Sequence, residues 1–159
     1  MLKSSKGKVI KTMEVVIANK EVYRKYEILE KFEAGISLIG QEVKSIKSKK
    51  ISLSSSYVII RGEQAYLVGA KIPPYQPKNA PADYQPDRAR RLLLKKQEIR
   101  YLLGKAQQKS LTLIPLQVYT KRGIIKLEFG IARGLKKIDK RELIKKREIE
   151  QRIRRIVRG

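Results

Sequence analysis

The sequence contains neither cysteine nor histidine, and Asp and Glu together account for only 15 of its 159 residues. The lack of cysteine excludes disulfides, thiolate metal sites and a thiol nucleophile. The lack of histidine removes the commonest metal ligand and the usual general base. The chain also lacks a nucleophile elbow and a phosphate-binding glycine loop. We therefore expect a protein that is not an enzyme and that needs no metal or other cofactor.

Long apolar runs are missing as well. No stretch approaches the roughly 18 apolar residues that cross a bilayer. Residues 1–11 carry scattered charges rather than an apolar segment before a cleavage site. We expect a soluble, intracellular protein. Hydrophobic residues still make up 42% of the chain, which is enough for one domain with a core of ordinary size.

Positive charge is what the sequence has in excess, because 38 Lys and Arg residues give it a formal net charge of +23. A polyanionic partner, whose phosphates release counterions when they are neutralised, best explains so much charge. Residues 1–133 carry +16 and residues 134–159 carry +7, which is more than twice as much per residue. We therefore predict a basic, weakly ordered arm over residues 1–18, a nucleic-acid-binding domain over residues 19–133 and a basic tail over residues 134–159.

Alternating apolar residues predict strands in the first half of the domain. One run covers residues 26–32, and a second begins at Ile36 after a turn predicted at Ala34-Gly35. Residues 41–50 are predicted to form a short helix, and residues 57–68 a β-hairpin.

Proline interrupts the pattern in the middle of the chain, where five of the six prolines fall between Pro73 and Pro86. This density predicts a surface loop, and the tyrosines within it leave contact with RNA open as an alternative role. A helix then starts somewhere between Asp87 and Lys95. Leu93 and Leu94 lie off its apolar face, so either the helix begins after them or they are presented to a partner.

Two further strands are predicted over residues 111–119 and 124–132. In the second strand the apolar residues share one parity, which places Lys126 on the outward face. In the first strand the parity changes around Pro115, which predicts a β-bulge or a barrel corner. About six short strands with two interposed helices suit a mainly β fold with some α: an OB-type antiparallel β-barrel with short flanking helices and a basic C-terminal tail.

Two basic clusters, over residues 44–50 and 88–96, and eight tyrosines favour RNA binding, because RNA is commonly held by phosphate attraction together with stacking. For each cluster the alternative is a solvated basic face. The tail over residues 139–158 has apolar residues at helical spacing among many charges. Such a helix would lie on the domain, on a membrane or in an RNA groove, and be disordered in isolation.

Several strings of residues are more specific than these patterns. They are Asn19-Lys20, Tyr26-Glu27-Ile28, Glu33-Ala34-Gly35-Ile36, Gly40-Gln41-Glu42-Val43-Lys44-Ser45, Ser56-Tyr57-Val58, Arg90-Arg91-Leu92-Leu93-Leu94, Gly134-Leu135-Lys136-Lys137 and Asp139-Lys140-Arg141. In order and spacing the strings resemble the small protein B family, the tmRNA-binding (SsrA-binding) proteins of bacterial ribosome rescue, over about residues 19–145.

The resemblance implies an OB-type barrel that binds the tRNA-like domain of tmRNA, and a tail that becomes helical in the empty mRNA channel. Within the family, Glu33, Leu93 and Lys126 match positions needed for RNA binding. For Glu33, stabilisation of a turn is the alternative role. Our full expected RNA site is Glu33, Ala34, Gly35, Lys44, Arg90, Arg91, Leu93 and Lys126, and the expected ribosome-contacting tail residues are Lys136, Lys137, Asp139, Lys140 and Arg141.

Three positions depart from the family pattern. Ile138 stands where many relatives have His or Tyr, Arg24 stands where His is common, and Leu135 interrupts a usually basic run. An isoleucine cannot stack on a base as an aromatic ring does, whereas a guanidinium can. The departures bear on the contacts of the tail and not on the resemblance itself.

The expected function is delivery of aminoacylated tmRNA to stalled ribosomes in trans-translation. The expected partners are tmRNA, the decoding centre and mRNA channel of the small ribosomal subunit, and elongation factor Tu through tmRNA. The protein is expected to be a monomer in isolation, to work in the bacterial cytoplasm and not to bind membranes. A ribosomal or general RNA-binding OB-fold protein and a membrane-surface protein anchored by its terminal helix remain the alternatives.

Overall fold

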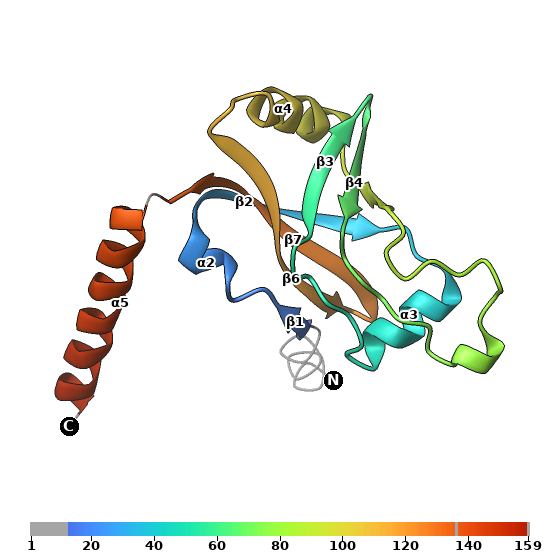
Figure 1. The fold of residues 1–159 in the computed structure, drawn as a ribbon, viewed down its shortest axis with the longest axis horizontal. Coiled ribbons are helices and arrows are strands. Elements are labelled where there is room, and N and C mark those ends of the chain that lie inside the picture. Colours follow the sequence, from blue (N-terminus) through green and yellow to red (C-terminus); the bar gives the residue numbers. More distant parts are fainter. Residues whose placement is uncertain (1–12, 136, 159) are drawn as a thin grey trace, which may run out of the picture.

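The computed structural model describes residues 13–135 and 137–158, with the side chains of residues 137–143 and 155–158 outside the description. The fold is mainly β with short helices (Figure 1). Its strands are β1 (Met13–Ala18), β2 (Tyr26–Ile36), β3 (Tyr57–Arg61), β4 (Gln64–Val68), β5 (Arg90–Leu93), β6 (Leu111–Lys121) and β7 (Ile124–Gly134). Its helices are α2 (Val22–Lys25), α3 (Gly40–Lys47), α4 (Lys96–Ala106) and α5 (Lys137–Arg158), with a 3₁₀ turn at Pro77–Asn79.

The strands form one antiparallel sheet in which six of them pair in a closed circuit. The circuit runs β6–β3–β4–β5–β2–β7, and β7 pairs with β6 again. Strand β1 pairs with β6 outside this circuit. The antiparallel, mainly β prediction is therefore confirmed, with seven strands in the described residues rather than about six.

The core fills the interior of this circuit. The odd-numbered residues of β7 from Ile125 to Ile131 are buried, as their shared parity predicts, while Lys126 on the alternate face is partly exposed. Helix α4 packs against β3 and β6 and buries Ile99 and Leu102. Helix α3 contributes Ile46, which is fully buried.

The predicted irregularity at Pro115 is present. The register between β6 and β7 shifts between Pro115 and Gln117, so the strand continues with its faces exchanged. A bulge tolerates proline because the residue has no N–H group to donate to a ladder. The prediction of a bulge in this strand is confirmed.

The turn predicted at Ala34-Gly35 is wrong, because β2 runs through both residues without interruption. Ala34 pairs with Leu127, and Gly35 pairs with Lys126 on one side and Leu93 on the other. Strand β5 lies directly against Gly35, since a Cβ atom at this residue would be in van der Waals contact with the Cβ of Leu93 at 3.4 Å. Packing against two neighbouring strands keeps this segment extended.

The segment before α4 also differs from the prediction. Residues 90–93 form strand β5, so α4 does not start near Asp87 and begins only at Lys96. The helix therefore begins after Leu93 and Leu94, which was the first of the two alternatives drawn from the sequence. Glu98 marks the start of the helix by accepting a hydrogen bond from the backbone N–H of Lys95 at 3.2 Å.

Part of the segment expected to be an N-terminal arm is a strand of the sheet. Residues 13–18 form β1 and pair with β6, which corrects the arm boundary of 18. Val16 and Ile17 pack against the core, so burial of these two side chains accounts for the order of this segment. Residues 1–12 lie outside the described residues.

A buried ion pair fixes α3 to β5. Glu42 and Arg90 have fully buried side chains, and the Nε of Arg90 donates to Oε2 of Glu42 at 2.7 Å. Arg88 donates to the other carboxylate oxygen at 2.6 Å. Arg90 also donates to the carbonyl oxygens of Ala70 and Pro86, both at 2.8 Å. One guanidinium thus joins α3, β5, the segment after β4 and the end of the proline-rich loop.

The charge of Glu42 is maintained in spite of its burial. Burial alone would raise the pKa of this carboxyl, but hydrogen bonds from Arg88, the Ile39 N–H and Arg90 outweigh it and hold the pKa below its ordinary value. A carboxylate with a lowered pKa in the folded state stabilises the fold above its unfolded-state pKa. That contribution is lost as the pH falls through the folded-state pKa.

We predict that Glu42→Gln lowers the free energy of unfolding at pH 7 by about 3–5 kcal/mol, because the substitution leaves Arg90 buried without a counter-charge. The difference from wild type should be constant above about pH 5 and shrink in more acidic solution as Glu42 itself becomes neutral. Urea unfolding across this pH range measures both effects. Glu63→Gln, at an exposed residue of the β3–β4 turn, is the control; a pH-independent Glu42→Gln effect would contradict the prediction.

Candidate RNA interface

The outward face of the sheet carries a row of five paired residues. Val15 pairs with Tyr119, Tyr119 with Lys126, Lys126 with Gly35, and Gly35 with Leu93. Paired residues lie on the same face of a sheet, so the row crosses β1, β6, β7, β2 and β5 in succession. Leu93 at one end is 54% exposed and Val15 at the other is 45% exposed.

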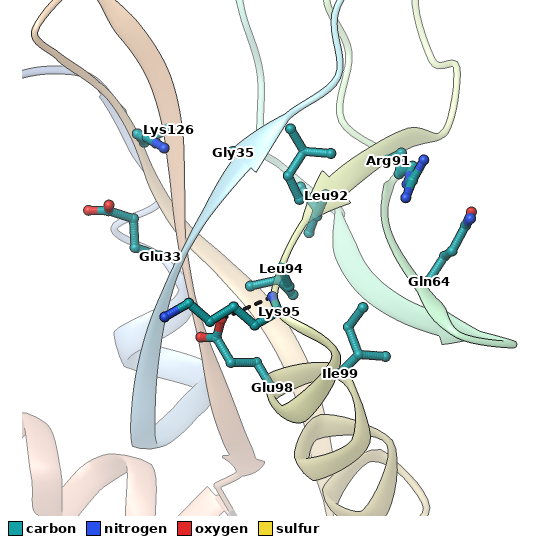
Figure 2. Close-up of a pocket in the computed structure, with 11 residues that line it drawn as sticks. Glu33, Gly35, Gln64, Arg91, Leu92, Leu94, Lys95, Glu98, Ile99 and Lys126 are labelled. Atoms are coloured by element: carbon teal, nitrogen blue, oxygen red, sulfur yellow. Dashed lines mark hydrogen bonds between the residues drawn. The ribbon is translucent and has the colours of Figure 1, made fainter.

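A groove of about 430 Å³ adjoins this row between β2, β5 and the start of α4. Its base is apolar, with Leu92 and Ile99 buried and Leu94 partly buried. Figure 2 shows Glu33 and Lys126 on one side of the groove and Arg91 and Gln64 on the other. The lining residues are Glu33, Gly35, Gln64, Arg91, Leu92, Leu93, Leu94, Lys95, Glu98, Ile99 and Lys126.

The carboxylate of Glu33 is held by side chains from β6. The hydroxyl of Tyr119 donates a hydrogen bond to Oε2 of Glu33, and the Nζ of Lys121 lies 3.7 Å from the same oxygen. Burial, followed by the hydrogen bond to Glu33, raises the pKa of Tyr119, so its phenol stays protonated throughout the physiological range. Glu33 therefore has a fixed orientation, although its side chain is 42% exposed.

Five of the eight residues expected in the RNA site line this one groove: Glu33, Gly35, Arg91, Leu93 and Lys126. They come from β2, β5 and β7, which are far apart in the sequence and adjacent in the sheet. The exposed position of Leu93 agrees with the sequence argument that this residue lies off the packing face.

The other three residues are placed elsewhere. Arg90 is fully buried against Glu42, so its charge is not on the surface and the sequence-based grouping with Arg91 is corrected. Ala34 is 2% exposed and belongs to the core, because it alternates with the outward Glu33 and Gly35. Lys44 is exposed on α3 and is not among the residues that line the groove.

Sequence reasoning missed several residues of this surface. Gln64, Leu94, Lys95, Glu98 and Ile99 line the groove but were not expected there. The signal for Lys95 and Glu98 was the capping pattern at the start of a helix, which was not used because the helix start was predicted only as somewhere between Asp87 and Lys95. Tyr119 was missed because its hydrogen bond to Glu33 depends on how β6 and β2 each pair with β7, which the alternation of residues within one strand does not specify.

The tail forms helix α5, which extends away from the sheet after β7 (Figure 1). The guanidinium of Arg147 donates to the carbonyl oxygen of Tyr23 in α2 at 3.1 Å and lies 6.0 Å from the centre of the Tyr23 ring. Ile149 and Ile153 are more than half exposed. Of the expected tail residues, Lys136 lies outside the described residues, and so do the side chains of Lys137, Asp139, Lys140 and Arg141.

Within residues 13–135 and 137–158, no three or more His, Cys, Asp or Glu residues are grouped so that they could hold a metal ion. Among the same residues, no helix combines the length and the apolar character that crossing a bilayer requires. Lysine and arginine side chains at the rim supply donors for phosphate, Leu93 supplies apolar contact, and Glu33 supplies an acceptor.

Comparison with known proteins identifies the family. The sequence model of the SmpB protein family matches residues 16–159. The chain belongs to the SmpB family. The assignment confirms the resemblance to small protein B drawn from the sequence strings, and the match includes the basic tail as well as the sheet.

Curated proteins named SsrA-binding protein match this chain over most of their length. The SsrA-binding protein of Trichodesmium erythraeum is 43% identical over 145 residues, which are 91% of this chain and 93% of that protein. The SsrA-binding protein of Acaryochloris marina is 47% identical over 135 residues, covering 85% and 88% of the two chains. The SsrA-binding protein of Thermosipho melanesiensis is 43% identical over 148 residues, covering 92% of this chain and all of that one.

A solved structure has a similar fold. A chain of the structure described as "tmRNA-SmpB: a journey to the center of the bacterial ribosome" superposes with a TM-score of 0.64 and 42% sequence identity. The match covers 80% of this chain and 93% of that one. The likeness therefore extends over four fifths of this chain.

The two neighbouring arginines of β5 should differ sharply in their effect on stability. We predict that Arg90→Ala lowers the free energy of unfolding by about 3–5 kcal/mol, because it removes a fully buried side chain with its hydrogen bonds to Glu42, Ala70 and Pro86 and leaves the buried Glu42 with Arg88 as its remaining partner. Arg91→Ala, at an exposed position on the opposite face, should change it by less than about 0.5 kcal/mol. Urea unfolding of both variants measures the difference. Similarly small effects of the two substitutions would contradict the burial of Arg90.

Proposed function

We propose that this protein binds the tRNA-like domain of tmRNA and delivers aminoacylated tmRNA to stalled ribosomes in trans-translation. The observation that supports the proposal most directly is the meeting of Glu33, Leu93 and Lys126 at one groove. These residues come from three strands, and the family resemblance had already assigned all three to RNA binding. The proposed function is binding and not catalysis.

Each of the three side chains supplies a different interaction with RNA. Lys126 attracts phosphate, which gives affinity but carries little sequence information. The exposed Leu93 packs against an unstacked base or a ribose. Glu33 accepts hydrogen bonds from base amino groups, which a phosphate cannot donate. A site with all three chemistries suits a folded RNA with accessible loop bases better than a uniform helix.

The proposal extends to the architecture and to the other partners. The closed circuit of six strands supports an OB-type barrel, in which one face and its loops contact nucleic acid. The basic helix α5 is suited to the rRNA-lined decoding centre and mRNA channel of the small ribosomal subunit. In this mechanism the protein acts in the bacterial cytoplasm, is a monomer in isolation and meets elongation factor Tu through tmRNA.

The proposal predicts that the protein prefers tmRNA over other RNAs even at physiological salt concentration. Filter binding at about 150 mM salt, where binding through phosphates alone is weakened, should give tighter binding to the tRNA-like domain than to elongator tRNA or random RNA. Leu93→Ala and Lys126→Ala should each weaken binding to the tRNA-like domain by about tenfold and leave the melting temperature nearly unchanged.

Lys71→Ala is the charge-matched control for Lys126→Ala, since Lys71 is exposed and does not line the groove. Equal losses from Lys71→Ala and Lys126→Ala would indicate attraction by net charge alone. Equal affinity of the wild-type protein for all three RNAs would favour the alternative of a general RNA-binding protein.

The tail is predicted to be separable from RNA recognition. Deletion of residues 138–159 should spare binding to the tRNA-like domain, because the groove is built from β2, β4, β5, β7 and α4, and should abolish rescue of ribosomes stalled without a stop codon. Binding is measured on filters, and rescue by peptide tagging in a reconstituted translation reaction. A parallel loss of both would contradict the division into a binding domain and a ribosome-contacting tail.

A further inference from the structure

The hydrogen bond between Tyr119 and Glu33 joins two strands that are not neighbours. Tyr119 is in β6 and Glu33 is in β2, and β7 lies between them in the sheet. The tyrosine side chain therefore reaches across β7 to donate its hydroxyl proton to Oε2 of Glu33. A contact of this length needs a long, stiff side chain, which tyrosine supplies with two rotatable bonds.

The two ends of this contact have different environments. Tyr119 is only 2% exposed, so its ring is held by packing, whereas the Glu33 side chain is 42% exposed. A buried tyrosine hydroxyl thus holds a carboxylate that is itself exposed to solvent. A surface glutamate without such an anchor samples several rotamers, and binding has to overcome the entropy of that motion.

Glu33 lies opposite a second carboxylate, which is an unfavourable position for a charged side chain. Glu33 pairs directly with Glu128 across β2 and β7, and like charges opposite one another destabilise a sheet. The amide of Gln117 donates to Glu128 at 3.3 Å, and Lys121 lies on the Oε2 side of Glu33. Among the described residues, no side chain or backbone group donates a hydrogen bond to Oε1 of Glu33.

We propose that Tyr119 is a positioning residue for RNA recognition: it fixes Glu33 so that Oε1 accepts a hydrogen bond from an N–H group on a base edge. The inference rests on the proposed function and adds a residue to it. The matching groups are the amino groups of cytosine, adenine and guanine on unpaired nucleotides. A phosphate oxygen is excluded as the partner, because it carries negative charge and has no proton to donate.

The chain contains a matched control for this role. The hydroxyl of Tyr101 in α4 donates to Oε1 of Glu30, which is on the same strand as Glu33. Neither Tyr101 nor Glu30 lines the groove. Tyr101→Phe therefore removes the same kind of tyrosine–glutamate hydrogen bond from β2 without touching the proposed site.

The experiment is a double-mutant cycle with Tyr119→Phe, Glu33→Gln and the combined variant. Affinities for the tRNA-like domain of tmRNA and for a random RNA of equal length are measured at about 150 mM salt, together with melting temperatures. Tyr119→Phe keeps the buried ring, so it should weaken binding to the tRNA-like domain by about tenfold and leave binding to random RNA unchanged. The combined variant should bind no more weakly than Glu33→Gln alone, and Tyr101→Phe should bind as the wild type does.

Three outcomes would overturn the inference. The first is wild-type affinity in Tyr119→Phe. The second is additive losses in the combined variant, which would mean that Tyr119 acts independently of Glu33. The third is an equal loss for both RNAs with a lowered melting temperature, which would identify a purely structural role. A wild-type protein that does not distinguish the two RNAs would instead overturn the proposed function, so the two failures are separable.

Discussion

The buried charge of Glu42 is the constraint on which the rest of the structure depends. Its two oxygens fix the guanidinium groups of Arg88 and Arg90, and Arg90 in turn binds carbonyl oxygens before and after the proline-rich loop. Strand β5 is four residues long and starts at Arg90, so the ion pair decides where that strand lies. Because β5 forms one wall of the groove, a charge inside the protein determines the shape of a surface outside it.

The long strands and the proline-rich loop could be predicted from the sequence because alternation and proline density are local properties. The segment from Arg90 to Leu94 could not, since its run of arginine and leucine fits an amphipathic helix and a basic surface equally well. Only the partner Glu42, 48 residues away, makes Arg90 a core residue and the segment a strand. Ala34-Gly35 has the same limitation, because its composition indicates a turn and its two neighbouring strands impose an extended chain.

The main residues of the candidate site could be predicted from the sequence, but the contacts between them could not. The family resemblance indicated Glu33, Leu93 and Lys126, but the contact from Tyr119 depends on register. Pro115 and the bulge beside it exchange the faces of β6, which turns Tyr119 outward beside Lys126. Without the extra residue in this strand, the tyrosine would face the core and Glu33 would lose its donor.

The closed circuit of pairings also has a consequence for folding during synthesis. Strand β1 pairs with β6, and β2 pairs with β5 and β7, so the first two strands to leave a ribosome have no partner until the later strands follow. Such distant pairings are slow to form, and unpaired strand edges are prone to aggregation in the meantime. The nascent chain must therefore avoid aggregation until β7 is synthesised. Electrostatic repulsion between chains that carry many lysines and arginines opposes such aggregation.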